Sequence, residues 1–310
     1  MNELLASAIF TLFVLGLLML DLGVFHRRAH RVSFREALLW SAFWIALSLA
    51  FNVGLYFWQG SQAALEFLTG YILEKSLSMD NLFVFALIFG YMAVPEEDQH
   101  RVLFWGVLGA LVMRGGFIAA GVALISRFHW ILYLFGVFLV ISGVRFLLQK
   151  EHQVHPERNP ILRLARKLFS VTEKYEGPSM FVRRNGRILA TPLFLVLVMI
   201  ETTDVVFAVD SIPAVFAVTQ DPFIVYTSNV LAILGLRALY FVLTGALSRF
   251  RHLRTGLSLV LIFVGAKMLV AGFYRLPIVV SLATILTILA GAILFSLLGK
   301  PGRGTDEPAV

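Results

Sequence analysis

The sequence predicts an all-α protein, a polytopic transmembrane helical bundle of about nine helices. Of its 310 residues, 59% are hydrophobic and 15% are charged, and the mean hydropathy is +0.84. Several apolar runs also reach the roughly 18 residues that a helix needs to cross hydrocarbon. A chain of this composition is a membrane protein, and the lipid bilayer is its first expected partner.

Nine spans follow from the apolar runs, taken in order along the chain. The first lacks the positively charged start and the small-residue cleavage site of a signal peptide, so we expect it to remain as an anchor. The predicted spans are 4–25, 37–58, 65–92, 101–125, 130–148, 190–218, 223–247, 255–274 and 277–299. The chain has no cysteine, which excludes disulfides, thiol redox centres and thiolate metal sites.

The loops predict the orientation. Nineteen Lys and Arg residues fall in the loops of one side, whereas only Arg127 and Arg275 fall in those of the other. Basic loops stay in the cytoplasm, so the N-terminus is expected in the periplasm and the C-terminus in the cytoplasm. The net charge of +7 is then explained by loops that lie against an anionic leaflet, and nucleic acid is not expected as a partner.

The longest polar stretch, 149–189, is a basic loop on the predicted cytoplasmic side. Within it, apolar residues at helical spacing over 160–169 predict a helix on the membrane surface, or else a solvated linker with helical tendency. An Asn-Gly pair between short apolar runs predicts a hairpin over 181–189. The polar tail 301–310 is expected to be disordered.

Two internal repeats are predicted within a single transporter domain, 1–310. Shifts of 130, 123 and 122 residues superpose Glu74-x5-Asp80 on Asp204-x5-Asp210, Arg114 on Arg237, and Gly143-Val144-Arg145 on Gly265-Ala266-Lys267. The units are 65–148 and 190–274, and each holds three helices. Because three is odd, the second unit enters the membrane from the opposite side, an inverted repeat that places a substrate site near the midplane. A chance match between apolar helices is the alternative.

Five carboxylates lie inside the predicted spans: Glu74, Asp80, Glu201, Asp204 and Asp210. An Asp at the centre of a span costs roughly 2.5–3.5 kcal/mol and a Leu returns only about 0.3–0.6, so these acids are expected to face an interior. A six-residue step turns a helix by about 600°, which puts Glu74 and Asp80 about 120° apart. The acid-bearing helices are therefore either surrounded or broken, and Pro213 favours a break beside Asp210.

Two interpretations of these acids are open. One is a buried ion-pair network with the cations of the same spans, Lys75, Arg114, Arg145, Arg237 and Lys267. Arg145 and Lys267 lie near helix ends, however, where long side chains reach the interface. The mid-depth acids then outnumber the mid-depth bases, so the other interpretation is a site for a cation and protons.

The ligand types narrow the choice of cation. All seven histidines fall in loops or at helix ends, and neutral oxygens accompany the acids, namely Ser76, Ser78, Asn81, Thr202, Thr203 and Ser211. Oxygen ligands suit Mg²⁺, Ca²⁺ or Mn²⁺ rather than Zn²⁺ or Cu. Met79 and Met199 adjoin the acids. A thioether ligand would favour Mn²⁺, and the alternative is that both methionines only pack.

At these residues the chain resembles a known family. The runs that carry the resemblance are Glu74-Lys-Ser-Leu-Ser-Met-Asp-Asn-Leu-Phe-Val-Phe, Glu201-Thr-Thr-Asp-Val-Val-Phe-Ala-Val-Asp-Ser-Ile-Pro, Asp221-Pro-Phe-Ile-Val-Tyr-Thr-Ser-Asn, Leu234-Gly-Leu-Arg-Ala-Leu-Tyr and Asp21-Leu-Gly-Val-Phe-His-Arg-Arg-Ala-His. They are similar to the TerC family in its longer, Alx-like branch, and through it to the LysE-type transporter superfamily.

The resemblance implies a bacterial inner-membrane protein. The family is named for tellurite resistance, was given a suggested redox role, and has members now regarded as Mn²⁺ exporters. Carried over by position, the residues implied to bind metal are Glu74, Asp80, Asn81, Glu201, Asp204 and Asp210. Asp21 also matches the family pattern, and three roles are open for it: a gate, an entry ligand or a partner of Arg27.

The expected function is export of Mn²⁺ by a secondary transporter, with proton antiport as a hypothesis and no permanently bound cofactor. No enzyme activity is expected, because the chain contains none of Gly-x-Gly-Asp, His-Glu-x-x-His or Gly-x-Ser-x-Gly. The alternative is a non-transporting membrane component of tellurite resistance or of a redox and stress response, which would dock through its basic loop. The sequence does not indicate which oligomeric state the protein adopts.

Overall fold

Eleven helices and one hairpin make up the part of the chain that the computed structural model describes, residues 3–20, 33–148, 160–184, 186–244, 253–274 and 276–298. The helices are α1 (Glu3–Leu20), α2 (Phe34–Gln59), α3 (Ser61–Tyr91), α4 (Glu96–Arg127), α5 (Ile131–Leu148), α6 (Pro160–Leu168), α7 (Pro192–Phe216), α8 (Pro222–Leu234), α9 (Leu236–Thr244), α10 (Leu253–Val270) and α11 (Ile278–Leu298). The predicted helical class is confirmed. Asp21, the loop segment 149–159 and the tail 301–310 lie outside the described residues.

Several helices are long and apolar enough to cross a bilayer. Six qualify by length and composition alone, namely α2, α4, α5, α7, α10 and α11, and α8 with α9 forms a seventh, bent span. Helix α3 is longer than most of them, but it carries four charged residues, Glu66, Glu74, Lys75 and Asp80. The described apolar stretch of α1, Leu5–Met19, is shorter. A multi-pass membrane protein is therefore confirmed, while the count of nine spans stays a prediction.

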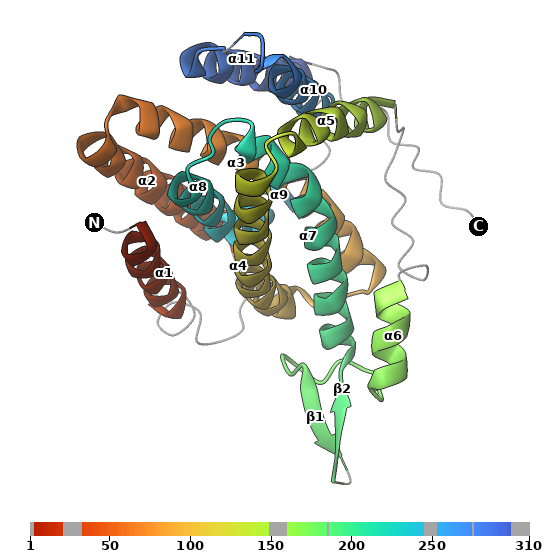
Figure 1. Cartoon of the computed structure of the whole chain (residues 1–310). Helices are drawn as coiled ribbons and strands as arrows, with labels where there is room; N and C mark the ends of the chain where they lie inside the picture. The colour runs from red at the N-terminus through yellow and green to blue at the C-terminus, as the bar shows by residue number, and fades with distance from the viewer. Residues whose placement is uncertain are drawn as a thin grey trace.

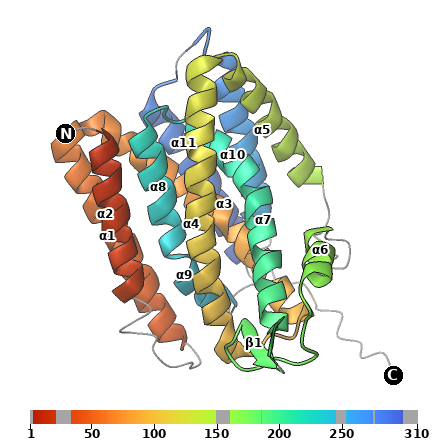
Figure 2. The ribbon, with the colours of Figure 1, turned by 60° about the horizontal axis from the view of Figure 1, so that its bottom comes forward.

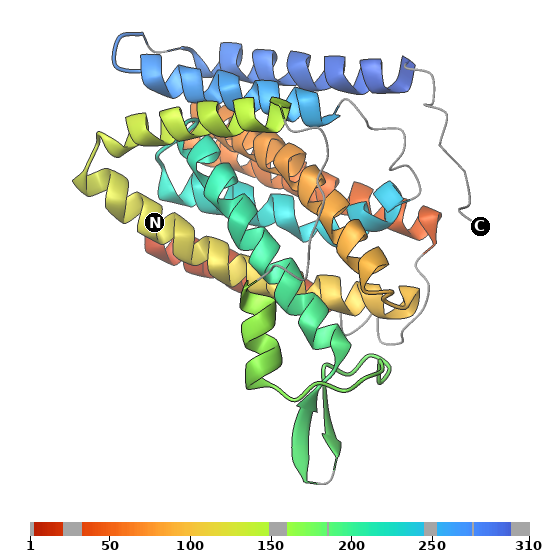
Figure 3. The same ribbon diagram turned by 90° about the vertical axis from the view of Figure 1, so that its right-hand side faces the viewer.

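The helices that carry the acids form the centre of the bundle. Helix α3 packs against both α7 and α8, and α4 packs against the same two helices. Figure 2 shows α4 crossing the front of the molecule between α8 and α7, with α3 behind it. On one side of this group, α5, α10 and α11 lie next to one another (Figure 3). Helices from both halves of the chain therefore enclose the centre.

The predicted span 223–247 contains a bend within the residues that the structure describes. Helices α8 and α9 meet at Gly235 with an angle of 42°. At the bend, Lys75 Nζ donates to the Ala232 carbonyl at 3.1 Å. A Cβ at position 235 would lie 2.7 Å from Lys75 Nζ and 3.1 Å from Trp44 Cβ, so only glycine fits without movement. A partly buried lysine that bonds a backbone carbonyl stabilises the interruption.

The break expected at Pro213 is wrong. Helix α7 continues through Pro213 to Phe216. Pro213 lies in the last turn of α7, so the one hydrogen bond that proline removes is lost where the helix is about to end. The Pro213 carbonyl still accepts from Ala217 N at 3.0 Å. The irregular backbone lies in the α8–α9 span instead.

The antiparallel pair α5 and α10 is packed through glycines. A Cβ at Gly265 would lie 2.7 Å from the Gly136 carbonyl oxygen, and one at Gly136 would lie 3.1 Å from that of Gly265. Toward the other end of the pair, a Cβ at Gly143 would lie 2.8 Å from the Ser258 carbonyl oxygen. Small residues allow two membrane helices to approach this closely.

Both predicted elements of the basic loop are confirmed as helix and hairpin. Helix α6 packs on α7 and buries Leu162 and Ala165 against the core, while Ile161, Leu164 and Leu168 are exposed. The hairpin pairs β1 (Phe181–Arg184) with β2 (Arg187–Ala190) in antiparallel register. Gly186 has φ +76°, the left-handed conformation that a two-residue hairpin turn needs. Figure 1 shows the hairpin projecting beyond the end of α7 beside α6.

Candidate cation site

Three helices bring three charged side chains together at the centre of the bundle. Arg114 of α4 is 1% exposed and forms ion pairs with Glu74 of α3 and Asp204 of α7. The distance from Arg114 Nη2 to Asp204 Oδ1 is 3.2 Å. Glu74 and Asp204 are themselves 0% and 5% exposed. We name this cluster the arginine triad. Charges buried this deeply in a protein are stable only when paired.

Neutral groups add hydrogen bonds to the arginine triad. Arg114 Nη1 donates to Ser211 Oγ at 3.2 Å and to Asn229 Oδ1 at 3.1 Å. Asn81 Nδ2 donates to Asp204 Oδ1 at 3.4 Å, and Ser78 Oγ donates to Glu74 Oε1 at 3.3 Å. The triad therefore joins α3, α4, α7 and α8 into one polar network inside the apolar core.

The remaining acids of the two six-residue motifs lie at a cavity of about 30 Å³. Asp80 of α3 and Asp210 of α7 line it with Glu74, and both are only partly exposed. The rest of its wall is formed by Leu77, Ser78, Asn81, Phe146, Phe207, Ser211, Arg254, Leu257 and Leu261. We name it the acidic cavity. Its volume is room for one or two water molecules or a single ion.

Asp210 has a fixed orientation in this cavity. Ser142 of α5 donates a hydrogen bond to Asp210 Oδ1 at 2.8 Å. One carboxylate oxygen is thus engaged by a neutral hydroxyl, which orients the group without cancelling its charge. The acidic cavity is therefore built from α3, α5, α7 and α10.

The fifth acid, Glu201, lies elsewhere on α7. Its carboxyl group packs directly over Gly109 of α4, so tightly that a Cβ at position 109 would overlap it. Glu201 does not line the acidic cavity. Of the six predicted metal ligands, Glu74, Asp80, Asn81 and Asp210 line the cavity, Asp204 belongs to the arginine triad, and Glu201 joins neither. All five acids are buried or partly buried, as the insertion cost predicted.

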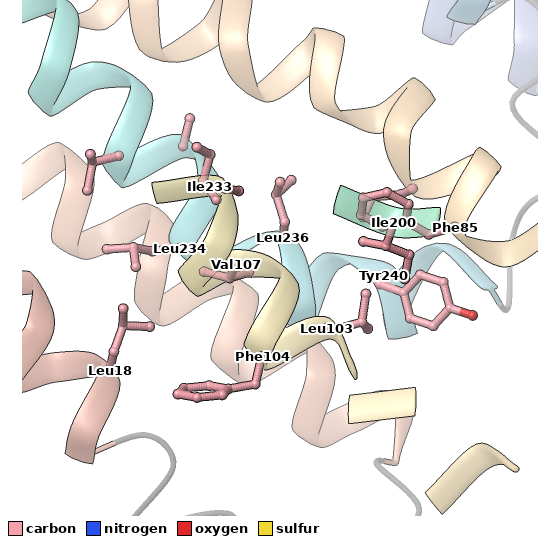
Figure 4. Packing of buried hydrophobic residues seen from close by; sticks show 14 of the residues in the cluster. Leu18, Phe85, Leu103, Phe104, Val107, Ile200, Ile233, Leu234, Leu236 and Tyr240 are labelled. Atoms are coloured by element: carbon pink, nitrogen blue, oxygen red, sulfur yellow. The ribbon is translucent and has the colours of Figure 1, made fainter. Parts of the chain in front are cut away.

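A second cavity, of about 20 Å³, also touches Asp204. Arg237 of α9 lines it, and the rest of its wall is apolar. Figure 4 shows part of that wall, with Phe85, Leu103, Val107, Ile200, Ile233 and Leu236. Arg237, which the repeat pairs with Arg114, therefore lines a cavity whose wall is apolar apart from Asp204 and Arg237 itself.

The ion-pair interpretation is thus confirmed for Glu74 and Asp204. Glu74 and Asp204 are paired with Arg114, whereas Lys75 bonds the Ala232 carbonyl and Arg145 is exposed. Across the residues that the structure describes, no three carboxylate, imidazole or thiol groups gather closely enough to hold a metal ion by themselves. A cation in the acidic cavity would therefore combine carboxylates with hydroxyl, amide or water oxygens.

Three residues of the site were missed from the sequence. Asn229, Ser142 and Arg254 each contribute a polar group to the triad or the cavity. Asn229 is 0% exposed in an apolar helix, and a buried amide inside a span is a sign of an interhelical hydrogen bond. That sign is present in the sequence. The contribution of Ser142 depends on the packing of α5 against α7, which the sequence does not reveal.

These features define a multi-pass membrane protein with buried acids at the contact of two helices. The chain belongs to the TerC family of integral membrane proteins, whose model matches residues 59–303. It is 50% identical over 304 residues to an uncharacterized membrane protein of Myxococcus xanthus, covering 97% of this chain and 95% of that one.

Other relatives carry a functional name. A Salmonella typhi protein, 48% identical over 289 residues and 90% of each chain, is named Alx and described, as a provisional role, as a membrane-bound redox modulator. An Escherichia coli K12 protein of the same name is 47% identical over the same length. No solved structure matches the chain. Placement in the wider LysE-type superfamily stays a prediction.

Proposed function

We propose that this protein is a secondary transporter that exports Mn²⁺ from the cytoplasm through the acidic cavity. The observation that carries the proposal is the composition of the cavity wall, which includes Asp80, Asp210 and Glu74 and lies inside a bundle of membrane helices. Ionisable groups at this depth are costly, and they commonly mark ion pathways.

The chemistry of the cavity favours a hard divalent cation. Its polar groups are carboxylates, the Asn81 amide, and the hydroxyls of Ser78 and Ser211, together with one guanidinium. Oxygen donors suit Mn²⁺, Mg²⁺ and Ca²⁺. Met79 and Met199 pack in the hydrophobic core, and neither lines the cavity. The choice of Mn²⁺ within this group therefore rests on the family resemblance.

Inverted repeats are part of the proposal. In the two repeats, α3 corresponds to α7, α4 to α8, and α5 to α10. The contact of α3 with α8 should therefore have an equivalent in the contact of α7 with α4, and both contacts are present. Under a shift of 122 residues, the close contact of Gly143 with Ser258 becomes that of Gly265 with Gly136, which is also present. These matched contacts support a pseudo-two-fold axis between the repeats 65–148 and 190–274.

Proton antiport would follow from the same groups. A carboxylate that releases Mn²⁺ can bind a proton instead. Protons taken up on the periplasmic side and released in the cytoplasm would then return the empty site to the cytoplasmic side for the next Mn²⁺ ion. Arg114 pairs with both Glu74 and Asp204, so the triad keeps a net charge of −1 when both carboxylates are ionised. Asp80 and Asp210, in the wall of the cavity, are the acids proposed to exchange Mn²⁺ for protons. In this proposal the protein is not an enzyme, binds no permanent cofactor and has no nucleic-acid partner. Its location is the bacterial inner membrane, with the C-terminus in the cytoplasm.

A redox or stress role is the second candidate, because the Alx relatives carry a redox name. With no cysteine in the chain, thiol exchange cannot be the chemistry. The second candidate would therefore be a docking role for α6 and the hairpin. It predicts that neutralising the acids is harmless and that deleting the hairpin is not.

Total cellular metal content separates the two candidates. Mn, Mg, Ca and Zn are measured by mass spectrometry in Mn-loaded cells that express the native chain or its Asp210→Asn variant at equal membrane abundance. The proposal expects lower Mn in cells with the native chain only. Equal amounts of all four metals in both strains would contradict export and favour the docking role.

A further inference from the structure

Arg254, in the first turn of α10, places a positive charge in the wall of the acidic cavity. It lines the cavity together with Asp80 and Asp210 and is only partly exposed. Its guanidinium carbon lies 5.9 Å from the centroid of the Phe146 ring, which also lines the cavity. A guanidinium remains charged at every physiological pH. The cavity wall therefore contains a permanent cation beside the carboxylates proposed to bind the cargo.

The position of Arg254 along the bundle is fixed by the α5–α10 pair. The two helices run antiparallel, with Gly136 beside Gly265 and Gly143 near Ser258. Arg254 thus lies beside the end of α5 from which the chain leads to α6. In the proposed orientation this is the cytoplasmic end, where Mn²⁺ would enter.

We propose that the Arg254 side chain acts as a built-in counter-ion, which competes with the transported cation for the carboxylates of the acidic cavity. While no cation is bound, Arg254 covers the cytoplasmic end of the cavity. This inference rests on the proposed function. A divalent cation and a guanidinium repel each other, so binding of the cargo near Asp80 and Asp210 displaces the arginine. In this structure the Arg254 guanidinium already lies over the Phe146 ring, and this cation–π contact positions it at the cavity wall.

Among the residues that the structure describes, the position that corresponds to Arg254 in the other repeat carries no charge. Under the 122-residue shift that superposes α5 and α10, the counterpart of Arg254 is Leu132. An inverted repeat by itself gives both mouths the same chemistry. Arg254 therefore makes the cytoplasmic mouth different from the periplasmic one, and loading would require displacement of a charge whereas release would not.

The inference is tested by Mn²⁺ binding to the purified protein in detergent, followed by the electron paramagnetic resonance signal of unbound Mn²⁺. Arg254→Gln should tighten Mn²⁺ binding about tenfold, because a competing positive charge is removed. Arg254→Met, which keeps an apolar stem against Phe146, should change it in the same direction. Arg254→Lys, which keeps the charge, should bind close to the native affinity.

A matched control distinguishes the effect of Arg254 on Mn²⁺ binding from the effect of removing an arginine elsewhere in the protein. Arg127 is exposed at the end of α4 and lies 6.0 Å from the Phe128 centroid, outside the acidic cavity, so Arg127→Gln should leave Mn²⁺ binding unchanged. A purely structural Arg254 would weaken binding when replaced.

Unchanged or weaker binding in monodisperse Arg254→Gln and Arg254→Met, with binding still lost in Asp210→Asn, would overturn this inference alone. Absence of Mn²⁺ binding by the native protein would overturn the proposed function as well.

Discussion

Two pairs of acids on the same two helices lie in different environments. Glu74 and Asp204 share Arg114, and all three side chains are almost fully enclosed. Asp80 and Asp210, six residues further along each helix, line a cavity and remain partly exposed. The same spacing thus gives one pair of acids that shares a buried arginine and one pair at a cavity whose wall also includes Glu74 and Arg254. In the proposed function, the first pair stabilises the bundle and the second pair binds the transported cation.

The largest expected effect comes from removing the shared cation. Arg114→Leu leaves Glu74 and Asp204 buried without a counter-charge, which should cost about 3–5 kcal/mol in the free energy of unfolding. Thermal unfolding in detergent and the yield of monodisperse protein measure it. The exposed Arg145 provides the control, since Arg145→Leu should change stability by no more than about 0.5 kcal/mol. Equal stability of Arg114→Leu and the native protein would show that the arginine triad is not structural.

Neutralising an acid of the cavity should separate function from folding. Asp80→Asn and Asp210→Asn keep the shape of the side chain but remove its charge, so we expect Mn²⁺ export to fall at least about tenfold while stability changes by less than about 1 kcal/mol. Export is measured as loss of Mn from preloaded cells. Asp204→Asn is a poorer test, because it also disturbs Arg114. Export at the native rate in both cavity variants would contradict the division between the two sets.

A smaller effect is expected from the hydroxyl that orients Asp210. Ser142→Ala removes one hydrogen bond of 2.8 Å and should weaken Mn²⁺ binding by about twofold to tenfold. The measurement is Mn²⁺ binding to purified protein. Because the charge of Asp210 is kept, Ser142→Ala should lose less affinity than Asp210→Asn. A loss as large as that of Asp210→Asn would mean that orientation, rather than charge, limits binding.

The smallest effect is expected outside both sets. Arg145 is exposed near the end of α5 and does not line the acidic cavity, and lysine preserves its charge. Arg145→Lys should therefore leave the rate of Mn²⁺ export within about twofold of the native rate. A large loss in the same export assay would place Arg145 on the pathway.

Much of the fold could be predicted from the sequence because each membrane helix satisfies its own backbone. The apolar runs therefore revealed the class and most helix positions. The bend at Gly235 could not be predicted, since its cause is the packing of Lys75 and Trp44 from other helices. The break predicted at Pro213 did not form, because Pro213 lies in the last turn of α7 and the helix continues through it.

The sequence indicated that the acids of the site lie inside the bundle, but not which of them pair with Arg114. The cost of burying charge predicted that the five acids face an interior, and all are buried or partly buried. Which of them meets Arg114 depends on how α4 packs between α7 and α8, and spacing along one helix does not contain that information. Arg254 was overlooked because it lies just before the predicted span 255–274 and faces the cavity only after α10 packs on α5.

Reconstituted transport tests the central claim most directly. Purified protein is placed in liposomes that contain a Mn²⁺-sensitive dye, and Mn²⁺ uptake is compared for the native chain, Asp80→Asn and Arg145→Lys. The account predicts uptake by the native protein and by Arg145→Lys, and uptake at the level of empty liposomes for Asp80→Asn. Uptake by Asp80→Asn at the native rate, or no uptake by the folded native protein, would contradict it.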